Sequence, residues 1–365
     1  MAIAPVSTGP VSSTQNASPS ATQLDAQNPW PGLAAYDEDS QAFFHGRDED
    51  ATELLRLIHL APLTVLYGNS GLGKSSLLQA GLFPRLRAGH YLPVYLRVDF
   101  SDQAEAPPLE QVARRLEQEI ARVGGDCPRR EADEDLWQYL HRKDLEIWSA
   151  DNFPLTPVLV FDQFEELFSR SGGNRARIDA VFHGLADLIE NRIPSELADD
   201  ATANERRARL DLLGQRYRIL LAFREDFLPE VETWKDKVPT LLRNRLRLLP
   251  MSRAQAIAAT ERAGAAVLEP GVAASIVDFV ASRDGETGGG VLTHQPASES
   301  ATTELTTAPT VEPVLLSLCC TQLNRRRAPG GKIDAALLAS ARAGHPAKLL
   351  PRGARRHARA RAPLY

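Results

Sequence analysis

A lysine and a serine close a glycine-rich run at residues 68–75. The run reads Gly-Asn-Ser-Gly-Leu-Gly-Lys-Ser and matches the pattern G-x-x-x-x-G-K-[ST] in full. Glycines let backbone N–H groups curl around an anion where a Cβ would obstruct the turn. Lys74 would bring a positive charge to the outer phosphates of a nucleotide, and the Ser75 hydroxyl can ligate Mg²⁺. The candidate nucleotide-binding residues are Gly68, Asn69, Ser70, Gly71, Leu72, Gly73, Lys74, Ser75 and Ser76.

The surroundings of this run favour phosphate binding over an ordinary glycine-rich turn that exposes a lysine. The apolar segment Leu63–Tyr67 predicts a strand immediately before it, and a helix is predicted from Lys74 onward. A helix N-terminus carries a partial positive charge and free N–H groups, so it would add to the attraction for phosphate.

An acidic residue at the tip of a neighbouring strand is the second requirement of such a site. The buried-strand pattern Val158–Phe161 ends at Asp162, which we expect to hold Mg²⁺ together with Ser75. Glu165 follows three residues later and is the candidate to polarise an attacking water, with Glu166 as its rival. The alternative is a plain helix N-terminus at which both glutamates only complement the helix dipole.

A cation is expected at the same edge of the sheet. Arg224 follows the apolar segment Tyr217–Phe223 and could sense the outermost phosphate from the end of that strand. The alternative is an arginine that pairs with Glu225 or Asp226. The guanine-reading sequence N-K-x-D does not occur, which favours ATP over GTP. The candidate catalytic residues are thus Lys74, Glu165, Glu166 and Arg224, and the candidate metal ligands are Ser75 and Asp162.

The elements that must position these residues alternate along the first 250 residues. Apolar runs that predict strands are separated by segments that predict helices, which indicates a parallel sheet covered on both faces and an α/β fold of the P-loop NTPase type. The predicted strands are Leu63–Tyr67, Leu92–Phe100, Pro157–Phe161 and Tyr217–Phe223. The predicted helices are Asp48–His59, one from Lys74, Leu109–Val123, Glu131–Ser149, Phe164–Ser169, Arg177–Asn191 and Asp226–Trp234.

The strand signal fades after Pro250, and the pattern predicts a smaller, all-helical region. Its helices are expected over Ser252–Ala263, with Ser252 as N-cap, then Val272–Arg283 and Val314–Arg326. We therefore divide the chain into a disordered leader at 1–28, a core at 29–250, a helical lid at 251–341 and a basic, disordered tail at 342–365. The lid carries a polar insertion near 285–310, and the leader is rich in Ser, Ala, Thr, Gln and Pro.

Composition excludes several classes of protein. The 365 residues are 43% hydrophobic and 24% charged, as expected for a soluble globular protein. The net charge of −5 becomes about −12 when the seven positive charges of residues 342–365 are set aside, which argues against a uniformly basic nucleic-acid binder. The tail alone could attract nucleic acid or anionic lipid through charge. Three cysteines give neither a disulfide framework nor a metal site.

The sequence predicts neither a secretion signal nor a membrane-spanning helix. Its first residues lack a basic and an apolar region, and no apolar run approaches the roughly 18 residues that suggest a spanning helix. These observations predict a cytoplasmic protein.

Four motifs in order resemble the STAND class of P-loop NTPases, and most closely its novel STAND NTPase 1 branch. They are Asn28-Pro-Trp-Pro-Gly-Leu33, Phe43-Phe-His-Gly-Arg-Asp48, the glycine-rich run and Val160-Phe-Asp-Gln-Phe-Glu-Glu-Leu-Phe168. The resemblance covers 28–326 and fades after Ala341, so the chain resembles a family member shortened after its lid. It implies that Gly46 and Arg47 lie near the adenine and ribose, that Glu165 is the catalytic acid and that Arg224 is a sensor arginine.

The resemblance also implies an activity and partners. We expect a regulatory NTPase that binds ATP and Mg²⁺, hydrolyses ATP slowly and acts as a switch in signalling or defence, with copies of itself as partners. Two alternatives remain open at this point. One is an adaptor that binds ATP without hydrolysing it, and the other is a nucleic-acid-dependent ATPase, which only the basic tail suggests.

Overall fold

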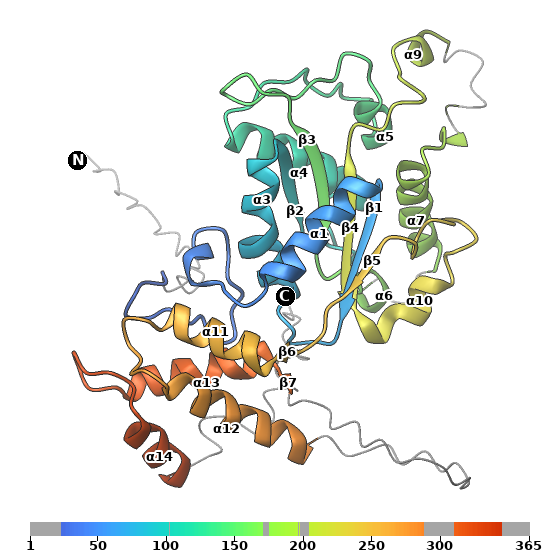
Figure 1. Cartoon of the computed structure of the whole chain (residues 1–365). Helices are drawn as coiled ribbons and strands as arrows, with labels where there is room; N and C mark the ends of the chain where they lie inside the picture. Colours follow the sequence, from blue (N-terminus) through green and yellow to red (C-terminus); the bar gives the residue numbers. More distant parts are fainter. Residues whose placement is uncertain are drawn as a thin grey trace, which may run out of the picture.

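A parallel five-stranded sheet forms the centre of the molecule (Figure 1). The computed structural model describes residues 23–101, 103–170, 175–195, 197, 204–287 and 310–344. The strand order is β2-β3-β4-β1-β5, and all neighbouring strands run parallel. The strands are β1 (Leu63–Gly68), β2 (Tyr91–Leu96), β3 (Thr156–Phe161), β4 (Arg218–Arg224) and β5 (Arg245–Arg247). The predicted α/β fold class is confirmed.

The apolar side chains of the strands are divided between two helical layers. Alternate strand residues point to opposite faces, so Leu66 and Val160 belong to one buried cluster while Val65 and Leu159 belong to another. The first face is covered by α1 (Asp48–Leu60), α2 (Lys74–Ser76), the π-helical turn η2 (Leu77–Leu82) and α3 (Phe83–Ala88). The second is covered by α4 (Pro108–Arg122), α5 (Leu136–Leu140) and α7 (Arg175–Ile189), with α10 (Leu228–Glu232) at its edge.

The parallel register brings the carboxyl ends of the strands to one edge. Gly68 at the end of β1 is paired with Arg224 at the end of β4, and Phe161 of β3 lies opposite Leu221 of β4. Asp162 therefore follows β3 at the edge where β1 and β4 also end. Short helical segments follow there or lie at the periphery: η3 (Glu225–Phe227), α6 (Glu166–Arg170), α9 (Asn204–Ala208) and η1 (Gln41–Phe43).

A smaller helical part follows the sheet and lies below it in Figure 1. It contains α11 (Arg253–Ala263), α12 (Val272–Thr287), α13 (Pro313–Arg326) and α14 (Ala335–Gly344). The predicted N-cap is confirmed, because the Ser252 side chain accepts from Gln255 N and the Gln255 side chain accepts from Ser252 N. A two-stranded antiparallel pair, β6 (Met251–Ser252) with β7 (Thr310–Val311), accompanies the helices.

Two sequence-based elements are corrected by the structure. The helix predicted over Glu131–Ser149 is reduced to α5, since the following segment is extended and buries Leu145 and Ile147 at the alternate spacing of a strand. Trp148 makes backbone bridges to Asp126 and Pro154 in this segment. The strand predicted over Leu92–Phe100 ends at Leu96, where its pairing with β3 ends at Phe161. Beyond this point the backbone N–H and carbonyl of Asp99 bond to the Gln111 side chain instead of to a strand.

The ends of the chain and the insertion lie partly outside the described residues. Residues 1–22, 288–309 and 345–365 are not described, so most of the predicted leader, polar insertion and tail falls there. Residues 23–28 of the predicted leader do contact the helical part, since Asn324 Nδ2 donates to Gln27 O at 2.7 Å. Residues 342–344 of the predicted tail belong to α14.

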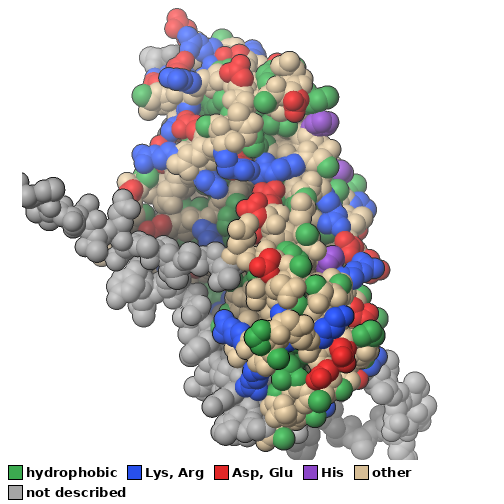
Figure 2. Space-filling model, turned by 90° about the vertical axis from the view of Figure 1, so that its left-hand side faces the viewer, with side chains coloured by type: hydrophobic (Ala, Val, Ile, Leu, Met, Phe, Trp, Pro, Cys, Tyr) green, Lys and Arg blue, Asp and Glu red, His purple; other side chains and the backbone are tan. Residues whose placement is uncertain are grey.

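The described surface mixes both signs of charge. Figure 2 shows Lys and Arg side chains interspersed with Asp and Glu over one face of the molecule, as the nearly balanced composition predicts. Within the described residues, no helix combines the length and the apolar character that crossing a lipid bilayer requires.

Candidate nucleotide-binding site

The glycine-rich run forms a tight loop between β1 and α2. Gly71 and Gly73 have positive φ angles of 84° and 83°, in the left-handed region that favours glycine. A Cβ on Gly68 would lie 2.6 Å from the carbonyl oxygen of Leu248, so glycine is required there by space. Lys74 Nζ folds back over the loop and donates to Gly68 O at 2.8 Å and to Asn69 O at 3.1 Å. The loop thus has the shape that an anion needs.

Ser75 and Asp162 meet although 87 residues separate them in sequence. Ser75 Oγ donates to Asp162 Oδ2 at 2.6 Å. Asp162 is only 4% exposed, and its second oxygen accepts from Gln163 N at 3.0 Å. A hydroxyl and a carboxylate side by side are oxygen donors of the kind that Mg²⁺ prefers, so these residues fit such an ion.

Glu165 and Glu166 have different surroundings in the same cleft. Glu165 is 9% exposed, and its Oε2 atom is buried without a hydrogen-bond partner among the described residues. Burial raises the pKa of Glu165 above its usual value, and the charge of Lys74 opposes this effect. Glu166 is half-buried, and its Oε2 pairs with Arg170 Nε at 3.3 Å. Both glutamates line the cleft, and burial raises the pKa of Glu166 as well, but it is Glu165 that has a buried oxygen without a hydrogen-bond partner.

Arg224 lies in this cleft and is already paired. Its Nε donates to Asp226 Oδ1 at 3.1 Å, and its Nη2 donates to Asp226 Oδ2. Its guanidinium also lies 5.7 Å from the ring centroid of Phe227. The ion pair with Asp226 that the alternative interpretation predicted is thus observed, and the sensing role stays a prediction for a side chain that lines the cleft.

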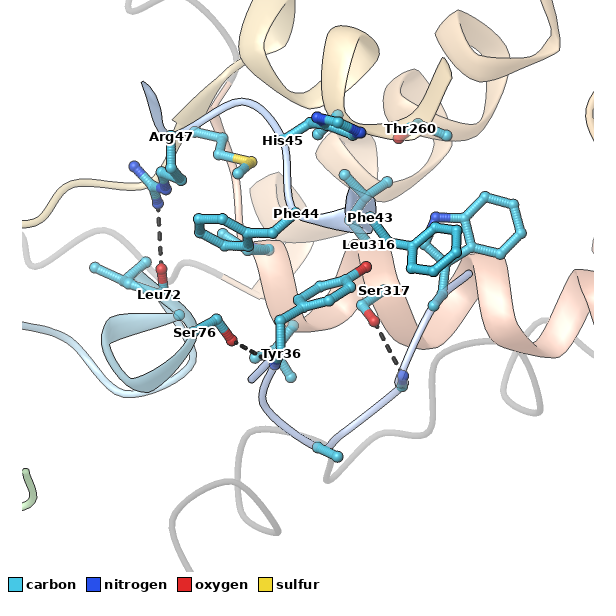
Figure 3. A pocket seen from close by; sticks show the side chains of 18 residues that line it. Tyr36, Phe43, Phe44, His45, Arg47, Leu72, Ser76, Thr260, Leu316 and Ser317 are labelled. Carbon is cyan, nitrogen blue, oxygen red and sulfur yellow. Dashed lines mark hydrogen bonds between the residues drawn. The ribbon is translucent and has the colours of Figure 1, made fainter. Parts of the chain in front are cut away.

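A second, largely apolar pocket adjoins the loop (Figure 3). The rings of Tyr36, Phe43 and Phe44 lie between the loop on one side and the helices α11 and α13 on the other. Residues 29–40, which we call the N-terminal strap, close this pocket. Tyr36 N donates to Ser76 Oγ at 3.1 Å, and Gly32 N donates to Ser317 Oγ at 3.1 Å. The strap therefore links the loop to the helical part, and the hydroxyl of Ser76 serves this link.

Gly46 and Arg47 lie beside this pocket and hold it together. Arg47 is 4% exposed, and its Nη2 donates to Leu72 O at 3.2 Å and to Leu249 O at 2.9 Å. Burial lowers the pKa of Arg47, and its ion pair with Asp50 opposes that change. Gly46 has a φ of 82°, and a Cβ there would lie 2.7 Å from Gln255 O. Arg47 thus links the loop to the segment that precedes β6, and Gly46 lets its own segment approach α11 closely.

Two residues that the sequence did not single out also contact Asp162. Tyr95 OH donates to Asp162 Oδ2 at 2.7 Å, and Arg97 Nε donates to Tyr95 OH at 3.0 Å. Tyr95 lies near the end of β2, which is the neighbour of β3 in the sheet, and Arg97 follows directly after this strand. Their contact with Asp162 could have been predicted only from the order of the strands in the sheet, and the hydrophobic pattern of the sequence does not specify that order.

The comparison with protein families agrees with this geometry. The family model of novel STAND NTPase 1 matches residues 29–288. The chain belongs to this family. A search among curated proteins found no match for this STAND NTPase. Because the chain belongs to the novel STAND NTPase 1 family, it is a nucleotide-binding protein of the P-loop NTPase type.

Solved structures with a similar fold are distant in sequence. The ORC2 protein of Aeropyrum pernix, solved as ADPNP–ADP complexes, aligns with a TM-score of 0.50 and 15% identity, covering 81% of this chain and 66% of that one. The Cdc6 protein of Pyrobaculum aerophilum gives a TM-score of 0.43 and 14% identity, covering 77% and 61%. The STAND NTPase chain spans less than two thirds of either protein, and the likeness to ORC2 shows the fold.

The buried carboxyl of Glu165 predicts a pH-dependent gain in stability on substitution. Because its pKa is raised in the folded state, the folded protein binds more protons than the unfolded chain between the two pKa values, and its stability falls as pH rises through that window. We expect Glu165→Gln to be more stable than the parent at neutral pH, with the difference shrinking as pH falls toward the usual glutamate value of 4.5. Urea unfolding at several pH values measures this, and a difference that does not depend on pH would contradict it.

Proposed function

We propose that this STAND NTPase binds ATP with Mg²⁺, hydrolyses it slowly and uses the bound nucleotide to set the arrangement of its sheet and helical parts. The contact of Ser75 with Asp162 at 2.6 Å, beside the glycine loop and the uncommitted Glu165, supports this proposal most strongly. The family membership supports nucleotide binding. We further propose that the protein acts as a switch in signalling or defence.

The residues of the cleft would have different roles in binding and hydrolysis. The loop amides and Lys74 would bind the phosphates, and Ser75 and Asp162 would hold Mg²⁺. The ion, when bound, supplies positive charge against the phosphate oxygens. Glu165 would accept a proton from the attacking water, and its raised pKa suits a base that works near neutral pH.

The aromatic pocket of Figure 3 is our proposed site for the adenine and ribose. It opens beside Gly73 and Ser76 of the loop, so a nucleotide with its phosphates on the loop can reach it. Its walls come from the loop, the strap and the helices α11 and α13. Since walls of both parts would contact one ligand, nucleotide binding would favour a closed arrangement of the two parts. Copies of the chain are the proposed partners of this switch.

Nucleotide binding by the Lys74→Ala variant tests the function. We expect the parent to bind ATP more tightly with Mg²⁺ than without it, and Lys74→Ala to bind it roughly 10- to 150-fold more weakly, as loss of a hydrogen bond to a charged group implies. Titration calorimetry measures both. Lys332→Ala is the matched control, because this exposed lysine lies in the turn between α13 and α14.

Three results decide between the candidate functions. Equal affinities of the parent and Lys74→Ala, with both folded by circular dichroism, would contradict the proposal. Binding without ATP turnover above the Lys74→Ala level would instead support an adaptor that does not hydrolyse ATP. Turnover that requires added DNA or RNA would support the nucleic-acid-dependent alternative.

A further inference from the structure

The carboxylate of Asp162 has almost no free capacity to accept hydrogen bonds. Its Oδ2 accepts from Ser75 Oγ at 2.6 Å and from Tyr95 OH at 2.7 Å, and its Oδ1 accepts from Gln163 N at 3.0 Å. A carboxylate offers about four acceptor positions, so one remains, on Oδ1. The three donors come from three different segments, which fixes the carboxylate in both position and rotation.

Tyr95 is the donor that the P-loop pattern does not supply. Its hydroxyl can give only one proton, and Arg97 Nε donates to its oxygen at 3.0 Å. Because the phenol oxygen accepts from Arg97, its proton is available for Asp162. Arg97 Nη2 also lies 3.6 Å from Asp162 Oδ2.

The packing of Tyr95 does not by itself require a hydroxyl. The ring is half-buried and packs edge-on against Phe83, with centroids 6.0 Å apart, and phenylalanine would make the same contact. What distinguishes tyrosine at this position is the hydrogen bond to Asp162. Arg97 is 52% exposed in the cleft, where it can support the phenol without filling the core.

We propose that Tyr95, held by Arg97, is a positioning residue that sets the orientation in which Asp162 receives the divalent ion. The inference rests on the proposed function, since it concerns the ion of the same site. A positioning residue acts through the side chain that binds the metal. Loss of a hydrogen bond to such a metal-binding side chain typically weakens metal affinity by about 10- to 100-fold.

The Tyr95→Phe variant tests the proposal through the Mg²⁺ dependence of nucleotide binding. We measure the affinity for a fluorescent ATP analogue as Mg²⁺ is raised, and the binding of Mn²⁺ by electron paramagnetic resonance in the presence of ADP. We expect the Mg²⁺ midpoint to rise about tenfold or more, while affinity without a divalent ion stays unchanged. Tyr91→Phe is the control, because Tyr91 begins the same strand and stacks on His59 away from the cleft.

The Arg97→Ala variant provides a second test, at a side chain that is exposed. We expect its midpoint to rise in the same direction but by less than in Tyr95→Phe, because Arg97 supports the phenol and its charge also lies 3.6 Å from Asp162 Oδ2. The effects of the two substitutions should not add in the Tyr95→Phe/Arg97→Ala double variant, because both side chains act on the same carboxylate. A parent-like midpoint in Tyr95→Phe overturns the proposal, as does an equal loss of affinity with and without the ion. If the parent itself shows no Mg²⁺-dependent nucleotide binding, the proposed function fails first and this inference fails with it.

Discussion

Replacing Glu165 with glutamine is expected to lower the rate of ATP hydrolysis by roughly 10²- to 10⁴-fold, the usual contribution of a general base. The exchange removes a proton acceptor but keeps the size and shape of the side chain. Glu165 Oε2 has no hydrogen-bond partner among the described residues, so nucleotide affinity should stay close to that of the parent. A coupled assay of phosphate release, together with titration calorimetry, separates the two quantities.

Glu166→Gln is the matched control for this prediction. Glu166 is adjacent in sequence and also lines the cleft, but its carboxylate is engaged by Arg170. We expect turnover in this variant to change little. A large loss in Glu166→Gln with none in Glu165→Gln would assign the catalytic role to the other glutamate.

Replacing Trp30 with alanine is expected to lower the free energy of unfolding by about 3–5 kcal/mol, as for other large aromatic residues removed from a core. Trp30 is 7% exposed and belongs to the buried cluster of the helical part, although it precedes the whole sheet in sequence. Its ring lies so close to Gly264 that a Cβ there would be 2.6 Å from a ring atom. Urea unfolding followed by circular dichroism measures the loss.

Leu33→Ala is the control for Trp30→Ala. It lies in the same N-terminal strap and is 40% exposed, so its truncation removes little buried area. If the two variants lose equal stability, the strap is not anchored by its tryptophan.

The parts of the site on β1 and β3 could be predicted from the sequence because their signals are local. The glycine run and the apolar run before Asp162 each specify an element and its end, and parallel strands then bring those ends to one edge. The contact of Tyr95 with Asp162 could not be predicted in this way. It depends on β2 being the neighbour of β3, which is a property of strand order rather than of either segment.

Weak local sequence patterns explain the remaining differences between the predicted and the observed helices and strands. β5 has three residues, two of them arginines, so neither apolar content nor length marks it as a strand. The stretch after α5 carries apolar residues that also fit a helix, but pairing of Trp148 with distant backbone groups decides its conformation. Such tertiary contacts override local propensity.

The position of the strap has a consequence for how the protein is made. Trp30 O accepts from Thr321 Oγ1, a residue 291 positions later in the chain, and Gly32 N donates to Ser317 Oγ across 285 positions. At translation rates of roughly 5–20 residues per second, this partner helix leaves the ribosome about 15–60 s after the strap. During that interval the emerging tryptophan lacks the part of its docking surface that α13 supplies, so the pocket beside the phosphate loop can be completed only after α13 has been synthesised.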